Sequence, residues 1–181
     1  MTPTSTTLRP ATRLRLLASA IGLALGACAT PPVVNWPAEL APSANEAWLM
    51  TVAARGVQLY ECRANTSGAA WAFVAPEAEL FDDARRKVGT HGAGPFWQHN
   101  DGSRVLGTMK ARADAPMADA IPWLLLETRS DGPAGAISGV KNIRRVHTVG
   151  GLAPREGCSP GTLGTTVRVP YAADYFLYTT R

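Results

Sequence analysis

The chain has 181 residues, of which 46% are hydrophobic, and this suits one domain with a single core. Its 17 glycines and 14 prolines favour many short strands joined by turns over a helical fold. Arg9, Arg13 and Arg15 supply most of the formal charge of +4, so the basic balance belongs to the first residues and does not support nucleic-acid binding.

The first residues have the form of a targeting segment. The three arginines precede an apolar run from Leu16 to Leu25, which is too short to span a bilayer, since spanning takes about 20 residues. Leu25-Gly26-Ala27-Cys28 then resembles the lipobox of bacterial lipoproteins, in which the cysteine becomes the lipidated N-terminus. We interpret residues 1–27 as a lipoprotein signal peptide. The alternative is an ordinary secretory signal beside an incidental Cys28.

Lipidation at Cys28 would make the membrane a partner of this protein without any spanning helix. Ala29, which follows the cysteine, favours sorting to the outer membrane with the protein facing the periplasm. Residues 28–42 contain four prolines and read as an extended tether, which leaves residues 43–181 as a single β-rich domain.

Two cysteines remain after Cys28. Outside the cytoplasm, two cysteines in one domain usually pair, so we predict a disulfide between Cys62 and Cys158. The chain-entropy model gives such a long-range bridge about 4 to 5 kcal/mol of stabilisation. Two thiols that bind a metal are the alternative, but neither cysteine has a second ligand at CxxC spacing.

The start of the domain allows two interpretations. Ser43 to Glu46 has the form of a capping box, which would begin a helix. The alternating residues 48–54 instead favour a strand that turns at Arg55-Gly56 into a second strand over 57–63. The next strand, Trp71 to Val74, is expected to stop before Pro76.

We predict that the stretch from His91 to Ser103 directs the path of the chain into a hairpin and does not form an active site. Asp101-Gly102 separates two apolar arms, residues 96–99 and 103–107, and both residues tolerate the positive φ of a hairpin turn. Trp97 would be placed to pack by this turn. His91 is the residue of the stretch that this interpretation leaves without a structural role.

The remaining segments also predict strands. Residues 121–127 are apolar without alternation, which indicates a strand buried on both faces. Residues 140–149 read as a long strand, and residues 167–179 close the domain. We count about eight to ten short strands and predict an all-β fold, either an antiparallel β-sandwich or a partly closed β-barrel.

Six short motifs follow one another along the domain. They are Gly56-Val57-Gln58-Leu59-Tyr60-Glu61-Cys62, Trp71-Ala72-Phe73, His91-Gly92-Ala93-Gly94-Pro95-Phe96-Trp97, Asp101-Gly102-Ser103, Ile121-Pro122-Trp123-Leu124-Leu125 and Val169-Pro170-Tyr171-Ala172-Ala173-Asp174-Tyr175. Taken in order, they resemble the domain-of-unknown-function family numbered 3455 over about residues 47–180. The resemblance implies a secreted, β-rich domain with a bridge between its two cysteines, and it implies no reaction.

No residue pattern in the chain defines a reaction. The three histidines lack diagnostic metal-ligand spacing, no GxSxG elbow occurs, and we expect no metal and no cofactor. Arg144-Arg145 fits a solvated face, with anion binding as the alternative. The candidate functional surface consists of His91, Trp97, His99, Asp101 and Glu61.

We predict a cell-envelope lipoprotein that acts as a non-enzymatic ligand-binding or protein-interaction module, with a groove lined by Trp97 and tyrosines. The alternative is a small envelope enzyme in which His91 works with Glu61 or Asp174 as an acid–base pair.

Overall fold

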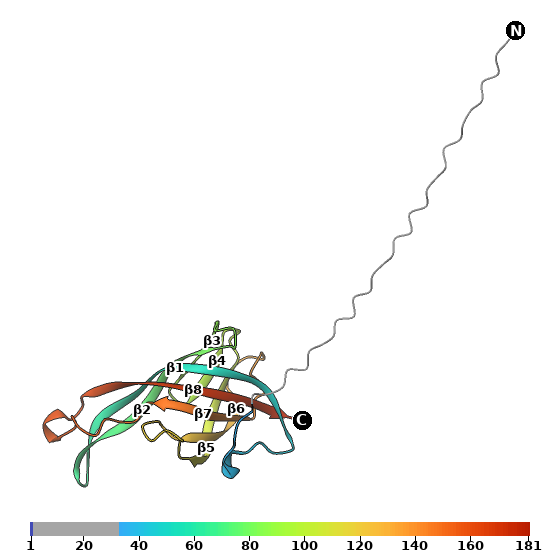
Figure 1. Ribbon diagram of the computed structural model, residues 1–181. Coiled ribbons are helices and arrows are strands. Elements are labelled where there is room, and N and C mark those ends of the chain that lie inside the picture. Colours follow the sequence, from blue (N-terminus) through green and yellow to red (C-terminus); the bar gives the residue numbers. More distant parts are fainter. Residues whose placement is uncertain (2–32) are drawn as a thin grey trace. The chain divides into compact units, whose positions relative to one another are not determined.

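The computed structural model describes Met1 and residues 33–181, and in it eight antiparallel strands form one sheet that closes into a ring (Figure 1). Each strand pairs with the next along the chain, and β8 pairs with β1. The predicted all-β fold is confirmed, although the ring is not a regular barrel. The strands are β1 (Glu46–Asn65), β2 (Gly68–Phe81), β3 (Lys87–Gly92), β4 (Phe96–His99), β5 (Arg104–Ala113), β6 (Trp123–Ser130), β7 (Asn142–Gly150) and β8 (Thr166–Thr180).

Helices are few in the described part of the chain. They are the short 3₁₀ turns η1 (Ala38–Leu40) and η2 (Pro160–Thr162), so the capping box at Ser43 does not begin a helix. Neither is long and apolar enough to cross a membrane. The predicted signal peptide and Cys28 lie outside the described residues.

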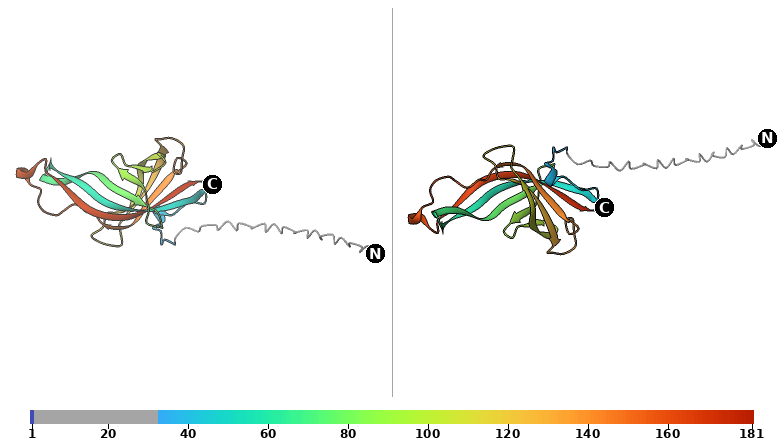
Figure 2. Two further views of the ribbon diagram at one scale, coloured as in Figure 1. Left: turned by 90° about the horizontal axis from the view of Figure 1, so that it is seen from above. Right: turned by 90° about the horizontal axis from the view of Figure 1, so that it is seen from below.

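Three strands run past the ring and form an arm (Figures 1 and 2). β2 pairs with β3 only through Ala78–Phe81, and the pairing of β7 with β8 ends at Tyr171. The remaining parts of β2 and β8 therefore flank β1 alone, as a three-stranded sheet with two open edges. The predicted bridge between Cys62 and Cys158 is present and ties the loop before β8 to this arm.

Two predicted strand boundaries are wrong for local reasons. β1 continues through Gly56, because this glycine lets β2 approach closely: a Cβ there would lie 2.0 Å from the carbonyl oxygen of Glu77. β2 continues through Pro76, which lies beyond the ladder with β3 and so needs no donor on that side. The turn at Asp101-Gly102 is confirmed between β4 and β5, and Gly102 has a φ of 90°.

Apolar side chains gather on both faces of the closed sheet. An inner cluster packs inside the ring and includes Trp97, Leu126 and Tyr175, whereas an outer cluster covers β6 to β8 and includes Trp123 and Phe176. The prediction that the apolar run at 121–127 is buried on both faces is therefore confirmed. Two cores on one sheet bury residues on both faces of the central parts of β6 to β8.

The outer cluster is completed by residues from the expected tether. Leu40 is fully buried there, and the Trp36 ring meets the Phe176 ring edge-on, with centroids 5.4 Å apart. Arg144 holds this segment in place. Its guanidinium donates to the carbonyls of Leu40 and Ala41, and it forms two hydrogen bonds of 2.8 and 2.9 Å with the Glu46 carboxylate.

Candidate functional site

A cavity of about 340 Å³ opens into the ring beside the base of the arm. Every strand contributes at least one side chain to its wall, so the cavity lies within the ring and is not a surface groove between two elements. Its volume is at the lower end of the usual range for ligand sites, about 300 to 1,000 Å³. The lining residues are Gln58, Phe73, Val74, Pro76, His91, Gly94, Pro95, Trp97, Met109, Leu124, Leu126, Arg145 and Tyr175.

The wall of the cavity changes character from its depth to its mouth. The deep part contains polar groups on buried residues, including Gln58, His91 and Tyr175. The mouth carries three exposed apolar side chains, since Phe73 is 52%, Val74 40% and Met109 58% accessible. The site is thus a mostly apolar chamber with a small number of polar groups inside it, the usual composition of a ligand site.

His91 is held in the chamber as a neutral imidazole. Its ring stacks on Trp97 with centroids 4.3 Å apart, and its Nδ1 donates to the carbonyl of Phe96 at 2.6 Å. Burial lowers the pKa of His91 to about 3; the Phe96 hydrogen bond opposes this shift and the charge of Arg145 adds to it. At neutral pH, His91 therefore brings no positive charge to the cavity.

Arg145 is the charged residue of the cavity wall, and it points to the opposite side of the sheet from Arg144. Its Nε and Nη2 donate to the carbonyl of Pro122 at 3.2 and 2.8 Å. No carboxylate of the described residues forms an ion pair with it, and the lining contains no acidic residue. The prediction that Arg144-Arg145 forms a solvated face is wrong, because Arg144 is only 1% exposed and Arg145 lines the chamber.

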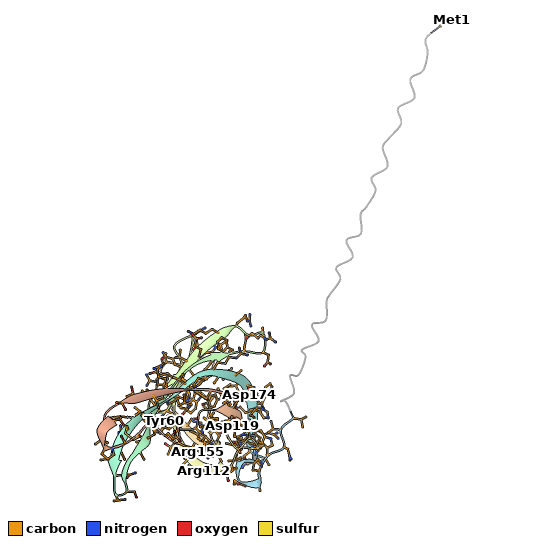
Figure 3. All side chains as sticks on the ribbon, turned by 60° about the vertical axis from the view of Figure 1, so that its left-hand side comes forward. Met1, Tyr60, Arg112, Asp119, Arg155 and Asp174 are labelled. Atoms are coloured by element: carbon orange, nitrogen blue, oxygen red, sulfur yellow. A yellow bond between two sulfur atoms is a disulfide. The ribbon has the colours of Figure 1, made fainter. Side chains whose placement is uncertain are left out.

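Three buried polar side-chain atoms of the cavity-lining residues have no hydrogen-bond partner among the described residues. They are Nε2 of Gln58, the indole Nε1 of Trp97 and the hydroxyl of Tyr175. The nearby Tyr60 (Figure 3) shows the usual arrangement, since its hydroxyl donates to the carbonyl of Gly151 at 2.6 Å. Most buried polar atoms in proteins are paired in this way, so unpaired ones beside a cavity point to a missing partner.

The five residues of the predicted functional surface lie in three places: inside the ring, at the β4–β5 turn and on the arm. His91 and Trp97 come together, but inside the ring. His99 and Asp101 lie 3.1 Å apart at the β4–β5 turn, and Asp101 accepts hydrogen bonds from the Ser103 hydroxyl and the Ala136 backbone. These bonds hold the pKa of Asp101 well below its usual value and give this carboxylate a role in shaping the turn.

The structure does not join His91 to either carboxylate named as its acid–base partner. Glu61 pairs with Arg63 on the arm, and Asp174 (Figure 3) pairs with His147 at 2.8 Å, with both side chains partly exposed. Within the described ranges, no group of three or more His, Cys, Asp or Glu side chains is arranged to hold a metal.

The predicted functional surface did not include Gln58, Arg145 or Tyr175, although anion binding by Arg144-Arg145 was the alternative to a solvated face and tyrosines were expected to line a groove. Gln58 shares one face of an alternating strand with Tyr60 and Cys62, and this pattern could have marked it as a buried polar residue. The inward direction of Arg145 follows from its position two residues after buried Ile143, but the register of the strand had to be known first.

Comparison with known proteins identifies a family for this chain. A family model described as a protein of unknown function, DUF3455, matches residues 42–179. No curated protein and no solved structure matches. The matched range contains β1 to β7, all of β8 except Thr180, and every residue of the cavity wall. The chain therefore belongs to the DUF3455 family.

Proposed function

We propose that this protein is a non-enzymatic ligand-binding module that takes a small, largely apolar molecule into the cavity of its strand ring. The observation that carries this proposal is the chamber of about 340 Å³, to which all eight strands contribute. Closed antiparallel sheets of this size hold one small ligand when side chains do not fill them completely.

The residues present favour binding over catalysis. His91 is neutral, donates its Nδ1 proton to a backbone carbonyl and has no carboxylate beside it, so the proposed acid–base pair lacks its second member. The chamber also favours a small ligand over a protein partner, because only three apolar side chains stand exposed at its mouth.

We also propose that the module works at the cell envelope, held on the periplasmic side of the outer membrane by a lipidated Cys28. The lipobox-like motif supports the anchor, and the disulfide suits an oxidising compartment. Mass spectrometry of the N-terminal peptide of the mature protein checks the acyl group, and a peptide without it contradicts the anchor.

Binding can be tested by closing the mouth of the cavity. The probe is N-phenyl-1-naphthylamine, a neutral apolar dye whose fluorescence rises when it leaves water. The full chain should bind it saturably, and Val74→Trp should weaken this binding at least about tenfold, because the added indole would fill the mouth.

Val149→Trp is the matched control, since Val149 is 48% exposed and lies outside the cavity wall. It should leave dye binding unchanged. Equal dye binding by both variants, or no saturable binding by the native protein, would contradict the proposal.

A further inference from the structure

We propose that the ligand is an amphipathic anion, with one carboxylate-type head group bound inside the cavity by Arg145 and an apolar body that extends toward the mouth. This inference rests on the proposed function and specifies the chemistry of its ligand. It follows from three independent features of the cavity wall.

The first feature is a cation without a counter-ion. The Arg145 side chain is only partly accessible, and no described carboxylate pairs with it. Its Nε and Nη2 reach the carbonyl of Pro122, while its Nη1 donates no hydrogen bond to any described residue. A desolvated charge is unfavourable unless it is paired, and a guanidinium binds carboxylates particularly well. An anion in the cavity would supply that partner.

The second feature is a group of buried donors without a hydrogen-bond partner among the lining residues, namely Nε2 of Gln58, the hydroxyl of Tyr175 and the indole Nε1 of Trp97. Nε2 of Gln58 can only donate, and it is buried without an acceptor. The hydroxyl of Tyr175 is buried near Arg145 and the Tyr171 hydroxyl but forms no hydrogen bond of good geometry with either, and burial raises the pKa of this tyrosine, so it keeps its proton at physiological pH. These donors and the Arg145 charge suit an acceptor that carries negative charge, and a carboxylate offers two such oxygens.

The third feature is that the cavity wall carries one positive charge, while the mouth of the cavity is apolar. His91 is neutral at physiological pH, so Arg145 is the single cation of the described cavity wall, and it matches one negative charge. Phe73, Val74 and Met109 leave an apolar surface at the mouth. A ligand that placed its charge inward would set its apolar part against these side chains, so the wall defines an orientation as well as a class.

The test compares three probes that share a ten-carbon chain and differ in the head group: decanoate, 1-decanol and decyltrimethylammonium. Each is used to displace N-phenyl-1-naphthylamine from the full chain at pH 8. Decanoate should displace the dye at a concentration at least about tenfold lower than the other two. A charge-assisted hydrogen bond contributes about 1.5 to 3 kcal/mol, which corresponds to a factor of about 10 to 150.

Arg145→Met should abolish the advantage of decanoate over 1-decanol. Arg145→Lys should retain part of the advantage, and it serves as the second variant if the methionine variant fails to fold. Arg129→Met is the matched control, because the side chain of Arg129 is 70% exposed and lies outside the cavity wall.

The outcomes separate this inference from the proposed function. If decanol and decanoate displace the dye equally well, and Arg145→Met changes neither, the anionic head group is wrong while the cavity remains a binding site. If the native protein does not bind the dye at all, both the binding function and the proposed class of ligand are contradicted.

Discussion

Arg144 and Arg145 are neighbours in the chain, yet they occupy opposite chemical situations. On the outer face, Arg144 is paired with the Glu46 carboxylate, donates to two backbone carbonyls and lies over the rings of Trp36 and Tyr178. On the inner face, Arg145 donates to one backbone carbonyl and lines the cavity. The difference separates a charge used to stabilise the fold from a charge kept available for a ligand.

The largest expected effect comes from breaking the ion pair between Arg144 and Glu46 on the outer face of the sheet. Arg144→Met should lower the free energy of unfolding by about 3 to 5 kcal/mol, because it leaves Glu46 as a buried carboxylate without its partner. Urea denaturation of the full chain measures this. The double variant Arg144→Met with Glu46→Gln should recover part of the loss. A single-variant loss below about 1 kcal/mol would mean that the ion pair does not hold the N-terminal segment.

The next effect concerns the pH dependence of stability. The cavity, through His91, and the Arg144–Glu46 ion pair on the outer face should lose their contributions to the free energy of unfolding in different pH ranges. His91 titrates near 6.5 when unfolded and near 3 when folded, so the unfolded chain binds the additional proton. Its contribution to stability is complete above about pH 6.5 and is lost as the pH falls toward 3. Between pH 7 and pH 5 the free energy of unfolding should fall by about 2 kcal/mol.

The contribution of the Arg144–Glu46 ion pair to the free energy of unfolding should stay unchanged between pH 7 and pH 5. Burial raises the pKa of Glu46, but the hydrogen bonds from Arg144 and Ser43 outweigh burial and hold the pKa below its ordinary value of 4.5. Its contribution is lost only below about that pH. Urea titrations of native protein and of His91→Gln at both pH values check the assignment, since the variant should lose most of the difference. An equal difference in both proteins would contradict it.

The smallest effect on stability is expected at the inner arginine. Arg145→Met removes a partly desolvated charge and its hydrogen bonds to the Pro122 carbonyl, and these two contributions oppose each other. The free energy of unfolding should change by less than about 1 kcal/mol, in urea without ligand. A loss as large as that of Arg144→Met would show that both arginines stabilise the fold. It would contradict the distinction between a structural Arg144 and an Arg145 that is available for a ligand.

Much of the fold was predictable because it depends on local patterns. Alternation predicted strands over residues that belong to β1, Asp101-Gly102 identified the β4–β5 turn, and the unbroken apolar run predicted burial on both faces of β6. The path of β1 through Gly56 was not predictable, since a glycine that permits a close approach and a glycine that makes a turn look alike until the partner strand is placed.

The site was less predictable than the fold. The prediction placed His91 and Trp97 in one stretch, and their rings stack because β3 pairs with β4 over a short span of chain. Gln58, Arg145 and Tyr175 come from β1, β7 and β8, and they meet only because the sheet closes on itself. A cavity produced by ring closure depends on the register of all its strands, and no segment of the sequence contains that information alone.

The arm has a consequence for self-association. An open sheet edge offers unpaired backbone groups to any extended chain that approaches it, and such edges are common starting points for aggregation. Each open edge of this arm carries a proline, Pro76 on β2 and Pro170 on β8. Because proline removes a donor from the edge, the two prolines discourage strand addition, and the arm can project from the ring without recruiting a second copy of the chain.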